Sequence, residues 1–148
     1  MKSDAGPQIS EVGPREAWEI LSKDAASVLV DVRTAAEWSF VGTSDLSQLG
    51  KDVILLEWKS WPDMSPNPAF VGALMQEVGG LPSRFLFICR SGARSMQAAR
   101  AVADALSVKG TPVECINVAE GFEGDLNEHA HRGGLNGWKA HGLDWHQS

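Results

Sequence analysis

The sequence predicts a three-layer α/β domain in which helices flank a central, mainly parallel sheet of about five strands. Short runs of consecutive apolar residues, typical of strands buried on both faces, end near residues 32, 56, 88 and 118. Segments with apolar residues at helical spacing lie between several of these runs. Strands that alternate with helices pair in parallel, and their helices cover both faces of the sheet.

The first half of the chain is expected to hold two helices and two strands. Pro14 opens a helix over residues 15–22, and residues 28–32 form a buried strand. Thr34 and Glu37 have the spacing of a capping box, which predicts a short helix ending at Val41. Residues 53–56 are expected to form a second buried strand.

The second half begins with a turn-rich stretch, residues 62–68. A helix is expected next, with Asn67 as its N-cap and Pro68 as its first residue, ended by Gly79 and Gly80.

Residues 85–88 are expected to form a third strand, and residues 113–118 a further one. Apolar residues from Met96 to Leu106 predict a helix between them, closed at Gly110. The third strand ends at Cys89, and open parallel sheets bind ligands at the carboxyl ends of their strands.

Length and composition limit the function classes. The 148 residues and 43% hydrophobic content indicate one domain, over residues 9–148, after a disordered lead-in of residues 1–8. A net charge of −6 argues against nucleic acid as a partner, and no apolar stretch approaches the ~20 residues of a membrane helix. Two cysteines without a signal sequence predict a reducing, cytoplasmic location.

Residues 89–95, Cys-Arg-Ser-Gly-Ala-Arg-Ser, are the strongest functional signal. An apolar strand ends at Cys89 and a helical pattern follows, so backbone N–H groups at the helix N-terminus are expected to surround an anion. Such a site favours a nucleophilic thiolate. Gly92 permits a tight loop, and Ser91 and Ser95 leave the N–H groups accessible. The alternative is a buried, inert cysteine.

The two arginines of this loop are expected to differ in role. Arg94 closes the loop by bonding to loop carbonyls or to neighbouring acids, whereas Arg90 points outward to meet an anionic donor. Ordinary surface arginines are the alternative for both. Ser95 is also expected to cap the helix that follows.

Four other features have structural interpretations. Asp31 and Arg33 are expected to fix loops at a buried strand end, with Arg33 able to pair with Glu37. Cys115 is expected to be buried filler, with a resolving cysteine for Cys89 as the alternative.

Trp58 and Trp61 either wall the pocket or seal the edge of the core. The histidines in residues 128–131 belong to a polar loop rather than a metal site, because no further ligands complete the set.

The chain resembles the rhodanese-like sulfurtransferase family over nearly its whole length. Residues 29–33 with Glu37 and Trp38 look like the family's first signature, residues 89–95 like its active-site loop, and residues 134–142 like its closing glycine–tryptophan segment. The resemblance implies a rhodanese-like fold in which Cys89 carries sulfur as a persulfide. The persulfide or its anionic donor would be held by the loop amides, which belong to Arg90, Ser91, Gly92, Ala93, Arg94 and Ser95.

The implied activity is transfer of a sulfane sulfur from thiosulfate, or from a protein or small-molecule persulfide, to a thiol or cyanide acceptor. No metal or organic cofactor is expected. A phosphatase or arsenate reductase using Cys89 is one alternative. Related phosphatases have one more loop residue, however, and residues 89–95 contain no carboxylate to act as general acid. A non-catalytic binding or redox-sensing module is the other alternative.

The sequence departs from the family at two places. Residues 42–46 lack the histidine that many members have there. Residues 119–134 are longer than a typical connection, which predicts either a functional lid or a surface elaboration. The sequence leaves the position of this segment relative to Cys89 open.

Overall fold

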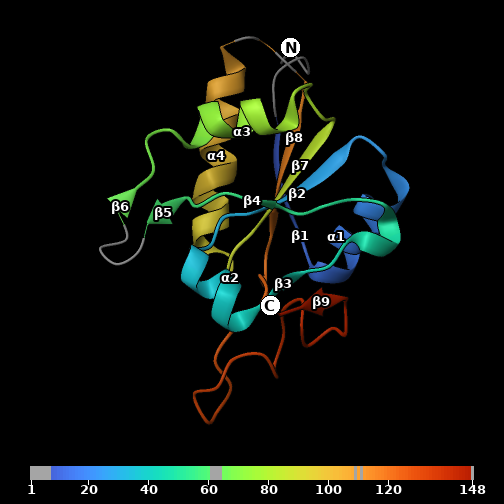
Figure 1. The fold of residues 1–148 in the computed structure, drawn as a ribbon, viewed down its shortest axis with the longest axis vertical. Coiled ribbons are helices and arrows are strands. Elements are labelled where there is room, and N and C mark those ends of the chain that lie inside the picture. The colour runs from blue at the N-terminus through green and yellow to red at the C-terminus, as the bar shows by residue number, and fades with distance from the viewer. Residues whose placement is uncertain (1–7, 61–64, 109, 111, 148) are drawn as a thin grey trace.

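The computed structural model describes residues 8–60, 65–108, 110 and 112–147. Its centre is a five-stranded sheet in which every pairing is parallel, in the order β1-β8-β7-β2-β4 (Figure 1). The strands are β1 (Gln8–Val12), β2 (Ser27–Asp31), β4 (Ile54–Leu55), β7 (Arg84–Ile88) and β8 (Glu114–Val118). The predicted parallel α/β sheet is therefore confirmed.

Helices cover both faces of the sheet, as the prediction of three layers requires. On one face α3 (Phe70–Val78) and α4 (Ala93–Ser107) pack on Phe85 and Phe87 of β7. On the other face α1 (Pro14–Lys23) and the 3-10 turn η1 (Ser47–Leu49) pack near Leu86 and Ile88. Alternate residues of β7 thus serve the two cores, as the two-residue period of a strand requires.

The edge strand β1 was not predicted, and it includes Gln8, which was expected to belong to the lead-in. Most of its side chains are exposed, including Ile9 at 44%, so the strand lacks the apolar run of an inner strand. The Gln8 N–H donates to the Val113 carbonyl, and the strand continues in register along β8. Long-range pairing, rather than local sequence, places this strand.

Two other boundaries differ from the prediction. Strand β4 has only two residues and lies at the opposite sheet edge, with Leu55 44% exposed, so it is not a buried strand. Helix α3 begins at Phe70 rather than Pro68, because the Asn67 side chain accepts from the Ala69 N–H and forms a turn there.

The remaining helix, α2 (Ala35–Val41), has the predicted capping box between Thr34 and Glu37. Two small antiparallel pairs complete the fold. They are β3 (Thr43–Ser44) with β9 (Trp145–His146), and β5 (Lys59–Ser60) with β6 (Ser65–Pro66). The C-terminal segment packs onto the core, with Trp138 fully buried. No helix in the described ranges is long and apolar enough to span a bilayer.

Candidate active site

The loop of residues 89–95 joins the carboxyl end of β7 to the N-terminus of α4. Gly92 is the N-cap, with a φ of 114°, and its N–H donates to the Cys89 Sγ over 3.1 Å. A Cβ at Gly92 would collide with the Ala119 carbonyl oxygen, so this position requires glycine in both conformation and space. The positive end of α4 therefore adjoins the Cys89 sulfur, as the sequence predicted.

A buried polar network contacts the same sulfur from the side. Cys89 is 1% exposed, and its Sγ lies 3.1 Å from the Ser95 Oγ. The Ser95 Oγ lies 2.5 Å from the Asn117 Oδ1 and 3.2 Å from the Gly92 carbonyl. A hydroxyl has one proton, so a Ser95 hydroxyl that donates to Asn117 offers only an oxygen lone pair to Cys89.

Because α4 begins at Ala93 with Gly92 as its N-cap, Ser95 is the third residue of the helix. The prediction that Ser95 caps this helix is therefore wrong. The network continues from the Asn117 Nδ2 to the Glu11 Oε2, at 2.8 Å. Sequence reasoning missed both Asn117 and Glu11. The available signal in the sequence was a polar residue, Asn117, within the otherwise apolar end of β8. In the structure the Asn117 side chain is 1% exposed.

Arg94 is held by Glu37 of α2 through two hydrogen bonds, NH1 to Oε1 at 2.7 Å and NH2 to Oε2 at 2.9 Å. Burial alone would raise the pKa of Glu37, but the hydrogen bonds and charge of Arg94, with the Thr34 N–H, lower it to about 2. The prediction that Arg94 bonds to a neighbouring acid is confirmed. The carboxylate neutralises its charge and ties α2 to the loop.

Asp31 and Arg33 form a fully buried pair, so the structural interpretation is supported. The Arg33 Nε and NH2 donate to the two Asp31 carboxylate oxygens at 2.9 and 2.7 Å. The NH2 also donates to the Gly42 carbonyl, which fixes the end of α2. The suggested pairing of Arg33 with Glu37 is wrong. Residues two apart in extended backbone share a side, which brings Asp31 and Arg33 together.

The long segment after β8 lies directly on the active-site loop. The Phe122 N–H donates to the Cys89 carbonyl at 2.8 Å, and the N–H groups of Glu123 and Gly124 donate to the Arg90 carbonyl at 3.0 and 3.1 Å. A Cβ at Gly121 would lie 2.5 Å from the Arg90 carbonyl oxygen. The segment therefore braces the loop, which settles the position that the sequence left open. Figure 1 shows it beyond the carboxyl ends of the strands, on the same side as α2.

A pocket of about 450 Å³ opens beside this loop. Its wall comes from three parts of the chain: α2 with its cap, the active-site loop, and the segment after β8. The lining residues are Thr34, Ala36, Glu37, Val41, Arg90, Arg94, Glu123 and Arg132.

The predicted substrate-binding residues divide into three groups. Arg90 and Arg94 line the pocket, and the Arg90 side chain is exposed, as predicted. Gly92 and Ser95 contact the sulfur. Ser91 is half-buried and Ala93 exposed within the loop.

Cys115 is buried in β8, and burial, with a smaller effect of the Glu114 charge, raises the pKa of its thiol to about 12. It is in register with Phe85, four residues before Cys89 on the neighbouring strand. That offset corresponds to about 13 Å along the strand. A disulfide needs Cα atoms within about 7 Å, so Cys115 cannot resolve Cys89 without rearrangement of the sheet.

Trp58 seals the core instead of lining the pocket. Its Nε1 donates to the Gln97 Oε1, and its ring packs edge-on against Phe70. Trp61 lies outside the described residues. The side chains of His129 and His131 are exposed. Over the described ranges, no group of three or more histidine, cysteine or acidic side chains is placed to hold a metal ion.

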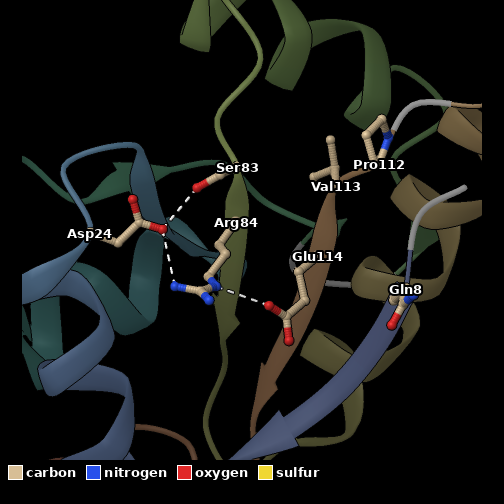
Figure 2. A pocket seen from close by; sticks show the side chains of 7 residues that line it. All are labelled: Gln8, Asp24, Ser83, Arg84, Pro112, Val113 and Glu114. Carbon is tan, nitrogen blue, oxygen red and sulfur yellow. Dashed lines mark hydrogen bonds and ion pairs between the residues drawn. The ribbon is translucent and has the colours of Figure 1, made fainter. Parts of the chain in front are cut away.

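A second pocket, of about 380 Å³, lies at the opposite, amino-terminal end of the strands (Figure 2). Arg84 bridges Asp24 and Glu114 across it, at 3.1 and 2.9 Å, and Ser83 donates to Asp24. The Ser83 hydrogen bond, with Ala26 N–H and nearby positive charges, outweighs burial and lowers the pKa of Asp24. These charges satisfy one another and no thiol lines the pocket, so the candidate chemistry belongs to the loop at Cys89.

Comparisons with known proteins give relatives without stated activities. No protein-family model matches the chain. It is 31% identical over 137 residues to the uncharacterized protein RC0915 of Rickettsia conorii, covering 93% of this chain and 97% of that protein. An uncharacterized protein encoded in the dnaA 5′ region of Rickettsia montanensis matches to the same extent. The crystal structure of Rv0390 from M. tuberculosis aligns with a TM-score of 0.83 and 42% identity, covering 95% of this chain and 99% of that one.

Proposed function

This chain belongs to the same family as RC0915 and Rv0390, and we propose that it is a rhodanese-type sulfurtransferase that carries sulfur as a persulfide on Cys89. One observation carries the proposal: the Cys89 sulfur accepts the Gly92 N–H at the N-terminus of α4. A helix N-terminus stabilises negative charge, both on a thiolate and on the persulfide that replaces it.

The first step is attack on a donor such as thiosulfate. The Cys89 thiolate forms a bond to the outer sulfur of thiosulfate, and the sulfur–sulfur bond of the donor breaks. Sulfite leaves with the electron pair of that bond. The three negative charges of the thiolate and the donor are then two on sulfite and one on the new persulfide. The exposed Arg90 side chain, which lines the pocket, is suited to attract such an anion.

In the second step an acceptor nucleophile attacks the outer sulfur of the persulfide. The bond between the two sulfurs of the persulfide breaks, and its electron pair returns to the Cys89 Sγ as a thiolate. Both steps are nucleophilic displacements at sulfur, so they regenerate the protein without an external oxidant or reductant. The same thiolate then starts another cycle.

Sulfur transfer is favoured over phosphate-ester hydrolysis by the state of Glu37. A cysteine-dependent phosphatase needs an acid to protonate its leaving group. Glu37 lies beside Arg94, but its pKa of about 2 keeps it ionised at neutral pH, and both its oxygens are held by Arg94. The loop itself contains no carboxylate. A sulfur displacement needs no such acid.

We also propose a cytoplasmic location and small-molecule or protein sulfur donors. Both Cys89 and Cys115 are free thiols, which suits a reducing compartment. The net charge of −6 opposes binding to nucleic acid or to an anionic membrane surface.

Intact mass measured after incubation with thiosulfate tests the proposal. The wild-type protein should gain one sulfur, and cyanide should remove it with release of thiocyanate. The Cys89→Ser variant, which keeps the size and polarity of the side chain, should gain nothing. An unmodified wild-type mass, together with rapid alkylation of Cys89 in the same sample, would exclude thiosulfate as the donor and count against the proposed activity.

A further inference from the structure

The pocket beside the active-site loop, which Arg90 and Arg94 line, carries a local excess of positive charge. Of its five charged lining residues, Arg94 and Glu37 neutralise each other through two hydrogen bonds. Arg90, Arg132 and Glu123 remain, so arginine exceeds glutamate by one. Lys139 adds positive charge behind the pocket wall, where its Nζ donates to the Val41 carbonyl. This excess is local, because the chain as a whole has a charge of −6.

Arg132 is placed at the pocket by the segment that braces the loop. Its NH1 donates to the Gly124 carbonyl at 2.7 Å, while the Gly124 N–H donates to the Arg90 carbonyl. The Gly133 N–H donates to the Glu123 carbonyl at 2.8 Å. The backbone that carries Arg132 is therefore tied by hydrogen bonds to the backbone of Arg90.

The pocket is also larger and more apolar than a small inorganic anion requires. Its volume of about 450 Å³ lies within the range of about 300–1,000 Å³ that is typical of pockets for organic ligands. Ala36 and Val41 of α2 add apolar surface to the lining of this pocket. Such a combination suits an organic molecule with a short aliphatic part and one negative group.

Resting on the proposed sulfurtransferase activity, we propose that the acceptor is a low-molecular-weight thiol that carries a carboxylate. Arg90 and Arg132 bind the carboxylate, and the aliphatic part lies against Ala36 and Val41. The acceptor thiol first gives its proton to the anionic outer sulfur of the Cys89 persulfide, and the resulting thiolate attacks that sulfur. A new sulfur–sulfur bond forms on the acceptor, the bond to Sγ breaks with its electron pair on Sγ, and the proton stays on the transferred sulfur.

The test measures how fast thiols remove sulfur from the thiosulfate-loaded protein. Mercaptopropionate, mercaptoethanol and cysteamine differ in carrying a carboxylate, no charge or an ammonium group. Each rate constant is divided by the rate of the same thiol with a simple disulfide in solution, which removes differences in intrinsic reactivity. The expected order is mercaptopropionate, then mercaptoethanol, then cysteamine, with roughly three- to tenfold between successive thiols.

Two pocket variants should shift this preference in opposite directions. Arg132→Gln should lower the ratio of mercaptopropionate to mercaptoethanol roughly three- to tenfold, and Glu123→Gln should raise it by a similar factor. Arg100→Gln, at an exposed position on α4 outside the pocket, is the matched control and should leave the ratio unchanged.

The two levels of the proposal fail differently. A loaded protein that transfers sulfur to all three thiols with equal normalised rates would overturn the assignment of the acceptor and leave sulfur transfer standing. The assignment of the acceptor is also overturned if both pocket variants behave as the Arg100→Gln control does. A wild-type protein that never gains sulfur would overturn the proposed function itself.

Discussion

Replacing Glu37 by glutamine removes the carboxylate that holds Arg94 and keeps nearly the same shape. The two side chains are only 21% and 14% exposed, so solvent screens their interaction weakly. A pKa of about 2, against an ordinary value of 4.5, corresponds to about 3 kcal/mol of folding free energy at neutral pH. The glutamine keeps one acceptor for Arg94, so we expect the variant to lose about 2 kcal/mol.

The pH dependence follows from the direction of the shift. Because the pKa of Glu37 is lower in the folded state, the unfolded state binds the extra proton in the acid range. The stabilisation is therefore complete above about pH 5 and decreases as pH falls from 4.5 towards 2. Glu37→Gln lacks this dependence, so the stability difference between wild type and variant should shrink over that range.

Urea unfolding of both proteins at a series of pH values from 7 down to 3 measures the effect. Glu19→Gln is the control, because Glu19 forms only an exposed pair with Lys23 on α1 and should change stability by less than about 0.5 kcal/mol. The reasoning is refuted if Glu37→Gln is as stable as the control at pH 7. A wild-type advantage that stays constant down to pH 3 would also refute it.

Three further perturbations have defined outcomes. Gly92→Ala should lower the free energy of unfolding in urea by about 2–4 kcal/mol, because the φ of 114° and the closely packed backbone exclude a Cβ. Gly72→Ala, in open space on α3, should not lower the free energy of unfolding, and equal losses in the two variants would contradict the argument. Asn117→Leu should raise the rate of Cys89 alkylation by iodoacetamide at pH 7 roughly three- to tenfold, because the Ser95 hydroxyl loses its acceptor on Asn117 and can donate to the sulfur. An unchanged or slower rate would count against this network. Burial raises the pKa of the Cys115 thiol to about 12, so Cys115 should stay unmodified by iodoacetamide in the native protein at pH 7 and react only after unfolding. Peptide mass mapping measures this, and alkylation of Cys115 in the folded state would contradict the burial argument.

Local sequence was sufficient where the determinants lie close together in the chain. The capping box of α2, the glycine end of α3 and the loop between β7 and α4 each depend on a few consecutive residues. The inner strands were also predictable, because burial on both faces requires a continuous apolar run.

Partners that lie far apart in the chain could not be read from the sequence. Glu37 and Arg94 are 57 residues apart, and Glu11 and Asn117 are 106 apart. Strand β1 carries mostly exposed residues, and only its pairing with β8 makes it a strand. The position of residues 119–134 depends on hydrogen bonds to the Cys89 and Arg90 carbonyls, which local propensity does not encode.

The central claim is that Cys89 transfers sulfur repeatedly. A limiting amount of protein, mixed with excess thiosulfate and cyanide, should release many equivalents of thiocyanate per protein at a constant rate, while Cys89→Ser releases none. Nitrophenyl phosphate, offered to the same samples, should remain intact. Release of at most one equivalent would indicate a thiol that reacts once, and hydrolysis of the phosphate ester without thiocyanate would indicate a phosphatase; either result would contradict the account.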